Sequence, residues 1–124
     1  MIAADTSSLV AYFTGAVGVD VERIGAALAA GNLVLPPVVV TELLSDVAAA
    51  ERIDAEISSI QTLDLTEGYW ARAGRMRRTL RRHGLKAKVA DALITQSCLD
   101  HDVALITRDR DFRHFAKHCG LKLA

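Results

Sequence analysis

The chain has 124 residues, of which 51% are hydrophobic and 24% are charged, and such a balance excludes an intrinsically disordered protein. Its length fits one domain, which we expect to span residues 1–124. The formal net charge is zero, but this value hides a very uneven distribution of charge along the chain.

The first third of the chain alternates short apolar strands with helices. We expect a buried strand at Ile2–Ala4, followed by hydroxyl residues at 6–8 that cap a helix running through Phe13. A second helix is expected from Asp20 to Ala30, and a second strand at Leu33–Leu35.

Two further helices are predicted in the middle of the chain. Pro36 and Pro37 begin the first, because proline is tolerated in a first helical turn, and we expect its inward side to carry Val39, Leu43 and Leu44. The second runs from Glu51 to Ile60 and leads to a short strand around Leu63.

A long basic helix is expected from residues 66–67 to residues 83–84. Its apolar residues recur at helical spacing and form a buried stripe of Tyr69, Ala73, Met76 and Leu80. Trp70 could stack a nucleic-acid base, although we expect it to be buried against the core.

The last third of the chain is predicted to contain a helix, a strand and a short helix. The helix runs from Lys88 to His101, with Val89, Leu93 and Leu99 pointing inward. A buried strand follows at 104–107, a short helix begins at Asp109, and residues 121–123 could form an edge strand. Strands separated by helices predict an α/β fold with a parallel sheet and helices on both faces.

The basic helix and the segment after it have charge of one sign only. Between Gly68 and Ala90 there are eight basic residues and no acid, so the remaining chain has seven basic residues against fifteen acidic ones. Such a segment is either a phosphate-binding surface or an ordinary solvated helix face. If it is a phosphate-binding surface of the kind that binds nucleic acids such as RNA, the residues expected to bind are Arg78, Arg81, Arg82, Lys86 and Lys88.

Four acidic residues fall where a parallel α/β sheet places its ligands, near the carboxyl ends of strands. Asp5 follows the first strand, and Asp109 comes shortly after the last buried strand. Glu42 and Asp91 lie on helices just downstream of turns. Each acid alone could instead be a helix cap or a surface residue, so only the combination indicates a site.

The segments around these acids resemble those of the PIN domain family, and in particular its VapC-type toxins. The similar segments are Asp5-Thr6-Ser7-Ser8-Leu9-Val10-Ala11, Leu35 to Leu44, Val89-Ala90-Asp91-Ala92-Leu93-Ile94, and Leu105 to Phe112. They occur in the family's order and with nearly its separations, and together they extend along most of the chain.

The resemblance implies a three-layer PIN-like fold with a parallel sheet of about five strands. It also implies that Asp5, Glu42, Asp91 and Asp109 form the catalytic site and bind Mg²⁺ or Mn²⁺ for hydrolysis of RNA to a 5′-phosphate and a 3′-hydroxyl. For the VapC branch it implies a homodimer held inactive by a cognate antitoxin. Asp111 is an additional acid beside the fourth position, and either Asp109 or Asp111 could be the fourth ligand.

Elementary electrostatics gives an independent reason for a cation. Two carboxylates ~5 Å apart repel by about 3 kcal/mol at an effective dielectric constant of ~20. A hard divalent cation relieves this repulsion and can activate water for attack on phosphate. Ser7 and Thr107 could hydrogen-bond to a carboxylate or water, or be ordinary capping hydroxyls.

Other classes of protein fit the sequence less well. The main alternative is a catalytically silent PIN-like module that only binds RNA or a protein, and the presence of all four acids argues against it. The N-terminus lacks the basic segment of a signal peptide, and no apolar stretch is long enough to cross a membrane. Two isolated cysteines form no disulfide framework or zinc site, so we expect a cytoplasmic protein.

Overall fold

The computed structural model describes all residues 1–124, and its centre is a parallel sheet. The strand order is β3-β2-β1-β4, with every neighbouring pair parallel. The four strands are short: β1 (Ile2–Ala4), β2 (Leu33–Leu35), β3 (Gln61–Thr62) and β4 (Ala104–Ile106). Because β1 lies between β2 and β4, the first and the last strand of the chain end side by side.

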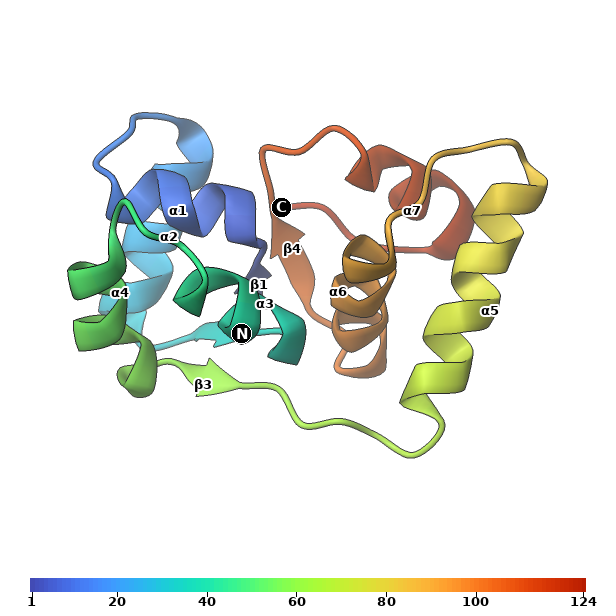
Figure 1. Cartoon of the computed structure of the whole chain (residues 1–124), viewed down its shortest axis with the longest axis horizontal. Helices are drawn as coiled ribbons and strands as arrows, with labels where there is room; N and C mark the ends of the chain where they lie inside the picture. Colours follow the sequence, from blue (N-terminus) through green and yellow to red (C-terminus); the bar gives the residue numbers. More distant parts are fainter.

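Seven helices flank this sheet and complete the three-layer α/β fold that the sequence predicts (Figure 1). They are α1 (Thr6–Phe13), α2 (Val19–Ala30), α3 (Pro37–Leu44), α4 (Ala50–Glu56), α5 (Tyr69–Arg82), α6 (Val89–Asp100) and α7 (Phe112–Cys119). None of them is long and apolar enough to span a membrane. The core between helices and sheet is mainly aliphatic, as the low content of aromatic residues predicts.

The sheet has four strands, and our prediction of about five is wrong by one. Residues 121–123, the expected edge strand, make only one parallel bridge, between Leu105 and Leu123. Two backbone hydrogen bonds support this bridge, from Leu105 N to Lys122 O and from Ala124 N to Leu105 O, each 2.9 Å long. A single bridged pair is too short to count as a strand.

Several helix boundaries also differ from the prediction. Helix α5 begins at Tyr69 and not at residues 66–67, because Gly68 adopts a left-handed conformation with φ of 78° just before it. Helix α7 begins after Asp111, so Asp109 lies in the loop that precedes it. The predicted helix 51–60 is α4 followed by a 3-10 turn, Ile57–Ser59.

The buried stripe of α5 is confirmed, whereas three other apolar residues lie at the surface. Val89, Leu44 and Trp70 are 56%, 52% and 65% exposed. On α6 the prediction is wrong for Val89, whereas Leu99 packs against the core as expected. The buried face of this helix also includes polar residues such as Thr95 and Ser97, so apolar residues alone do not mark that face. On α5, Tyr69 is buried as predicted, but the adjacent Trp70, which we also expected to be buried, is exposed.

Candidate metal centre

The site begins at the carboxyl ends of β1 and β4, where Asp5 is held by four hydrogen bonds. Its carboxylate accepts from Ser8 N at 3.0 Å, twice from Ser7 Oγ at 2.9 and 2.8 Å, and from Thr107 Oγ1 at 2.6 Å. Asp5 is thus the N-cap of α1, and the expected capping by the hydroxyl residues 6–8 is wrong. Asp5 is only 3% exposed, and this burial raises its pKa above the usual 3.8 although the hydrogen bonds oppose the change.

Three other carboxylates meet next to Asp5. Asp91 in the first turn of α6, Asp109 in the β4–α7 loop and Asp111 at the start of α7 each place one oxygen within 4.8 Å of the others. Asp109 Oδ1 accepts a hydrogen bond from Asp111 N at 2.9 Å, which ties the two loop acids together. Both therefore lie in the cluster, and the geometry offers Asp111 as a ligand as well as Asp109.

Asp91 is the most perturbed member of this cluster. It is 8% exposed, and its Oδ2 is buried without any hydrogen-bond partner. Burial, together with the negative charges of Asp109, Asp111 and Asp5, raises the pKa of Asp91 to about 6, although the positive charge of Lys88 opposes this change. A buried carboxylate oxygen without a donor requires either a proton or a cation.

Glu42 lies apart from the three clustered acids. It is half-buried on α3, and its Oε1 accepts a hydrogen bond from Thr6 Oγ1 at 2.8 Å. Since Thr6 follows Asp5 directly, this bond connects Glu42 to the Asp5 end of the site. The structure thus brings Asp91 and Asp109 together, with Asp5 near enough for its charge to raise the pKa of Asp91, and Glu42 lies at the margin.

An ion pair between Arg108 and Asp20, which holds the β4–α7 loop, was not predicted from the sequence. Arg108, next to Asp109, donates from Nε and Nη2 to the two carboxylate oxygens of Asp20 at 2.7 and 3.1 Å. Ser8 Oγ donates to the same Asp20 at 2.9 Å. The hydrogen bond from Arg108 lowers the pKa of Asp20 to about 2. The adjacency of Arg108 to Asp109 was visible in the sequence, but its partner 88 residues away was not.

The predicted RNA-binding residues lie on α5 and on the loop that follows it. All five are exposed: Arg78, Arg81, Arg82, Lys86 and Lys88. The three arginines form no ion pair, unlike Arg72, which contacts Asp100 at 2.6 Å. Lys88 lies near the acidic cluster, since its charge lowers the pKa of Asp91.

The donor set matches a hard divalent cation. All the available ligand atoms are carboxylate oxygens, which suit Mg²⁺ and Mn²⁺ better than softer metals. Oδ2 of Asp91 is buried and has no hydrogen-bond partner, and a cation would supply the positive charge that this oxygen lacks. The hydroxyls on Asp5 provide the outer contacts that usually orient metal ligands.

Acidic residues gathered at the carboxyl ends of a parallel sheet are the arrangement of an α/β domain with a ligand site at that edge. The chain belongs to the PIN domain family, which matches it over residues 2–118. No curated protein matches it.

Solved structures share the fold over the full chain. Three of them are VapBC2 of Rickettsia felis bound to a DNA fragment from its promoter, VapBC-1 of nontypeable Haemophilus influenzae, and FitAcB of Neisseria gonorrhoeae. Their TM-scores are 0.77, 0.75 and 0.70 at sequence identities of 21%, 20% and 19%. The alignments cover 100%, 100% and 99% of this chain and 98%, 97% and 96% of theirs.

Proposed function

We propose that this PIN domain, spanning residues 1–124, is an endoribonuclease that depends on Mg²⁺ or Mn²⁺ and hydrolyses phosphodiester bonds in RNA. The observation that carries the proposal is the cluster of Asp91, Asp109 and Asp111 beside Asp5, with one oxygen of Asp91 buried and unpartnered. A group of carboxylates that repel one another is costly to keep for folding alone and is typical of a site for a cation.

Each acidic residue has a role in this proposal. Asp5, Asp91 and Asp109 are ligands of the cation, and Asp111 is the alternative to Asp109 as a ligand. Glu42 binds the cation from the margin of the site. When bound, the cation supplies positive charge to a phosphoryl oxygen and increases the acidity of water at the site.

The hydroxyl residues and the buried position of the site assist this chemistry. Ser7 and Thr107 fix the orientation of Asp5 by donating to it, so that its oxygens need not reorganise when a ligand arrives. The low exposure of Asp5 and Asp91 limits competition from bulk water and strengthens the attraction between acids and cation.

We further propose that the chain is the toxin of a VapBC-type pair, forms a homodimer and is held inactive by a cognate antitoxin. Support comes from the fold shared with structures described as VapBC-1 and VapBC2, and from a Klebsiella pneumoniae structure described as a toxin–antitoxin complex, with a TM-score of 0.70. Co-expression with a candidate antitoxin, followed by co-purification and measurement of the oligomeric state, tests this part independently of catalysis.

The nuclease proposal is tested with purified full-length protein and a fluorogenic single-stranded RNA in Mg²⁺, Mn²⁺ or EDTA. We expect cleavage with either metal, none in EDTA, and a loss of at least ~100-fold for Asp91→Asn. The matched control is Asp54→Asn, which changes an exposed acid on α4 and should cleave like the parent. Cleavage by Asp91→Asn at the parent's rate would refute the site, and a parent that binds RNA without cleaving it would be a catalytically silent module.

A further inference from the structure

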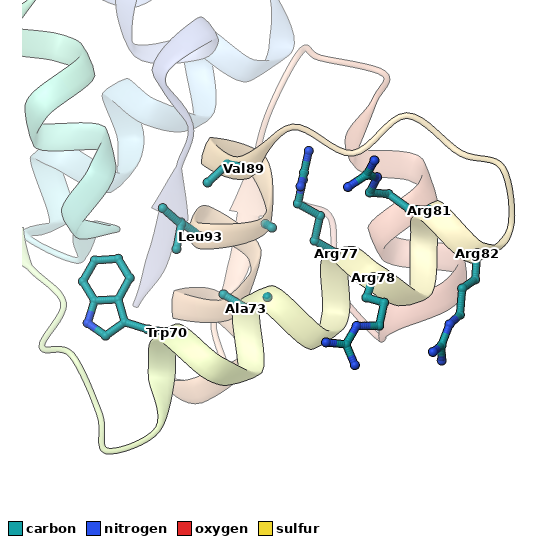
Figure 2. A pocket seen from close by; sticks show the side chains of 10 residues that line it. Trp70, Ala73, Arg77, Arg78, Arg81, Arg82, Val89 and Leu93 are labelled. Carbon is teal, nitrogen blue, oxygen red and sulfur yellow. The ribbon is translucent and has the colours of Figure 1, made fainter.

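A groove of about 660 Å³ lies between α5 and α6 and is separate from the acidic cluster. Figure 2 shows Trp70 at one end, small and aliphatic residues such as Ala73 and Leu93 in the middle, and arginines at the other end. The distance along α5 from Trp70 to Arg82 is about 18 Å, because an α-helix rises ~1.5 Å per residue. The groove is therefore long enough for several linked units of a polymer.

Trp70 is placed at the surface where a ligand can reach its ring. It is 65% exposed, and its aromatic contact is an edge arrangement with Tyr69, with centroids 5.1 Å apart and planes at 79°. Tyr69 itself is fixed, since it is buried and its hydroxyl donates to Leu93 O at 2.7 Å. Exposing a large indole to water is unfavourable, and a ligand that stacks on it would relieve this cost.

The opposite end of the groove carries positive charge that no acid of the chain neutralises. Arg78, Arg81 and Arg82 line it, are exposed and form no ion pair. Arg77 lines it as well, but its Nε donates to Ala87 O at 2.7 Å, which fixes this side chain to the α5–α6 loop. Three unpaired guanidinium groups along one helix match a chain of phosphates.

The groove and the acidic cluster both include residues of α6. Val89 and Ala92 line the groove, and Asp91 of the cluster lies between them in the same helical turn. Lys88 is exposed just before this turn and close enough to Asp91 to lower its pKa. The first turn of α6 thus contributes residues to both the groove and the acidic cluster.

We propose that the α5–α6 groove binds a single-stranded segment of RNA, with one base stacked on Trp70 and phosphates paired with Arg78, Arg81 and Arg82. The assignment rests on the proposed nuclease function, because it makes the groove a substrate subsite beside the acids. A stacking aromatic and a line of cations in one groove are the two elements of single-strand recognition. An acidic protein segment would use the arginines equally well, but the exposed ring of Trp70 offers a surface on which a base can stack.

The experiment measures RNA binding in EDTA, so that it does not depend on cleavage. Trp70 is the only tryptophan, and its fluorescence should be quenched when a single-stranded RNA oligonucleotide stacks on it. Trp70→Ala, followed by anisotropy of labelled RNA, should raise the dissociation constant about 5- to 150-fold. Arg78→Gln, Arg81→Gln and Arg82→Gln should each reduce the slope of binding against salt by about 0.7, because each variant pairs with one phosphate fewer.

Two further variants guard against an effect on folding. Gly74→Leu should fill the groove and weaken RNA binding without lowering the melting temperature, because a Cβ at Gly74 meets no atom within 4 Å and leucine favours helix. Arg75→Gln is the matched control, since Arg75 is exposed on the same helix but does not line the groove. It should bind RNA almost as the parent does.

The outcomes separate this inference from the proposed function. If the parent cleaves RNA and Trp70→Ala and Gly74→Leu bind it unchanged, the groove assignment is wrong and the nuclease stands. If the parent never cleaves RNA but binds it in a way that the groove variants weaken, the groove assignment stands and the proposed nuclease function is refuted. If sedimentation shows that Trp70→Ala loses self-association or antitoxin binding while its affinity for RNA is unchanged, the groove is a protein interface and the inference is overturned.

Discussion

Replacing Asp91 by asparagine should make the metal-free protein more stable at neutral pH. A pKa of about 6, against the usual 3.8, means that the ionised carboxylate costs the folded state about 3 kcal/mol at pH 7.5. The amide removes this charge but stays buried and loses a favourable interaction with the N-terminus of α6, worth ~0.5 kcal/mol. We therefore expect a net gain of about 1–2 kcal/mol, or a rise in Tm of about 4 °C per kcal/mol.

The stabilising effect of Asp91→Asn should depend on pH, because the parent's free energy of unfolding changes as Asp91 loses its proton. Between pH 3.8 and about 6 the folded parent keeps the proton on Asp91 while the unfolded chain has lost it, so the unfolded state binds fewer protons. The parent's free energy of unfolding should then fall by about 1.4 kcal/mol per pH unit from this group and level off above pH 6. The advantage of Asp91→Asn should accordingly vanish near pH 4 and reach its full size by pH 7.

Thermal melts of both proteins in EDTA from pH 4 to 7.5, and again with Mn²⁺, measure the effect. In the parent, Mn²⁺ at a hundred times its dissociation constant should restore about 2.7 kcal/mol, and the variant should gain much less. A variant that melts below the parent at pH 7.5 in EDTA, yet gains the full metal shift, would refute the reasoning. Asp91 would then be a plain structural acid.

Two other residues give predictions of their own. Asp109→Asn should slow RNA cleavage more than Asp111→Asn in initial-rate assays with Mg²⁺, because the resemblance to the PIN family places the fourth ligand at Asp109. The reverse ranking would transfer the ligand role to Asp111. Arg108→Gln should weaken Mn²⁺ binding, measured by titration, with little change in circular dichroism, since it releases the loop that carries Asp109 from Asp20. Arg108→Lys should restore part of the affinity, and no restoration would argue against positioning by this ion pair.

Much of the fold was predictable because each element has a local cause. The strands Ile2–Ala4 and Leu33–Leu35 are apolar runs bounded by polar or proline residues, and the structure places both as predicted. The expected fifth strand failed for a non-local reason. Whether residues 121–123 continue a ladder depends on their pairing with β4, and only one residue pair forms.

The site was predictable in its residues but not in its geometry. The positions of Asp5 and Asp109 after their strands follow from sequence, and the order β2-β1-β4 brings those strand ends together. Sequence could not say that Asp111 shares the cluster or that Glu42 lies outside it, because both depend on the exact path of a loop and a helix. The exposure of Trp70 could not be predicted either, because Trp70 and the adjacent Tyr69 are both large aromatic residues that favour burial.

The two buried acids of the site, Asp5 and Asp91, differ in how well the surrounding residues stabilise their ionised forms. This difference indicates different roles for them. Three neighbouring groups donate hydrogen bonds to Asp5, which keep it oriented and favour its ionised form against the effect of burial. Asp91 receives no such donor at Oδ2 and faces three other carboxylates, so the favourable charge of Lys88 and the N-terminus of α6 do not offset the cost of its ionised form. Asp5 is accordingly a preformed part of the site. The charge of Asp91, in contrast, depends on whether a proton or a cation is bound at its carboxylate. Proton binding, metal binding and folding stability are therefore coupled through Asp91, which is why a single amide substitution there should change all three.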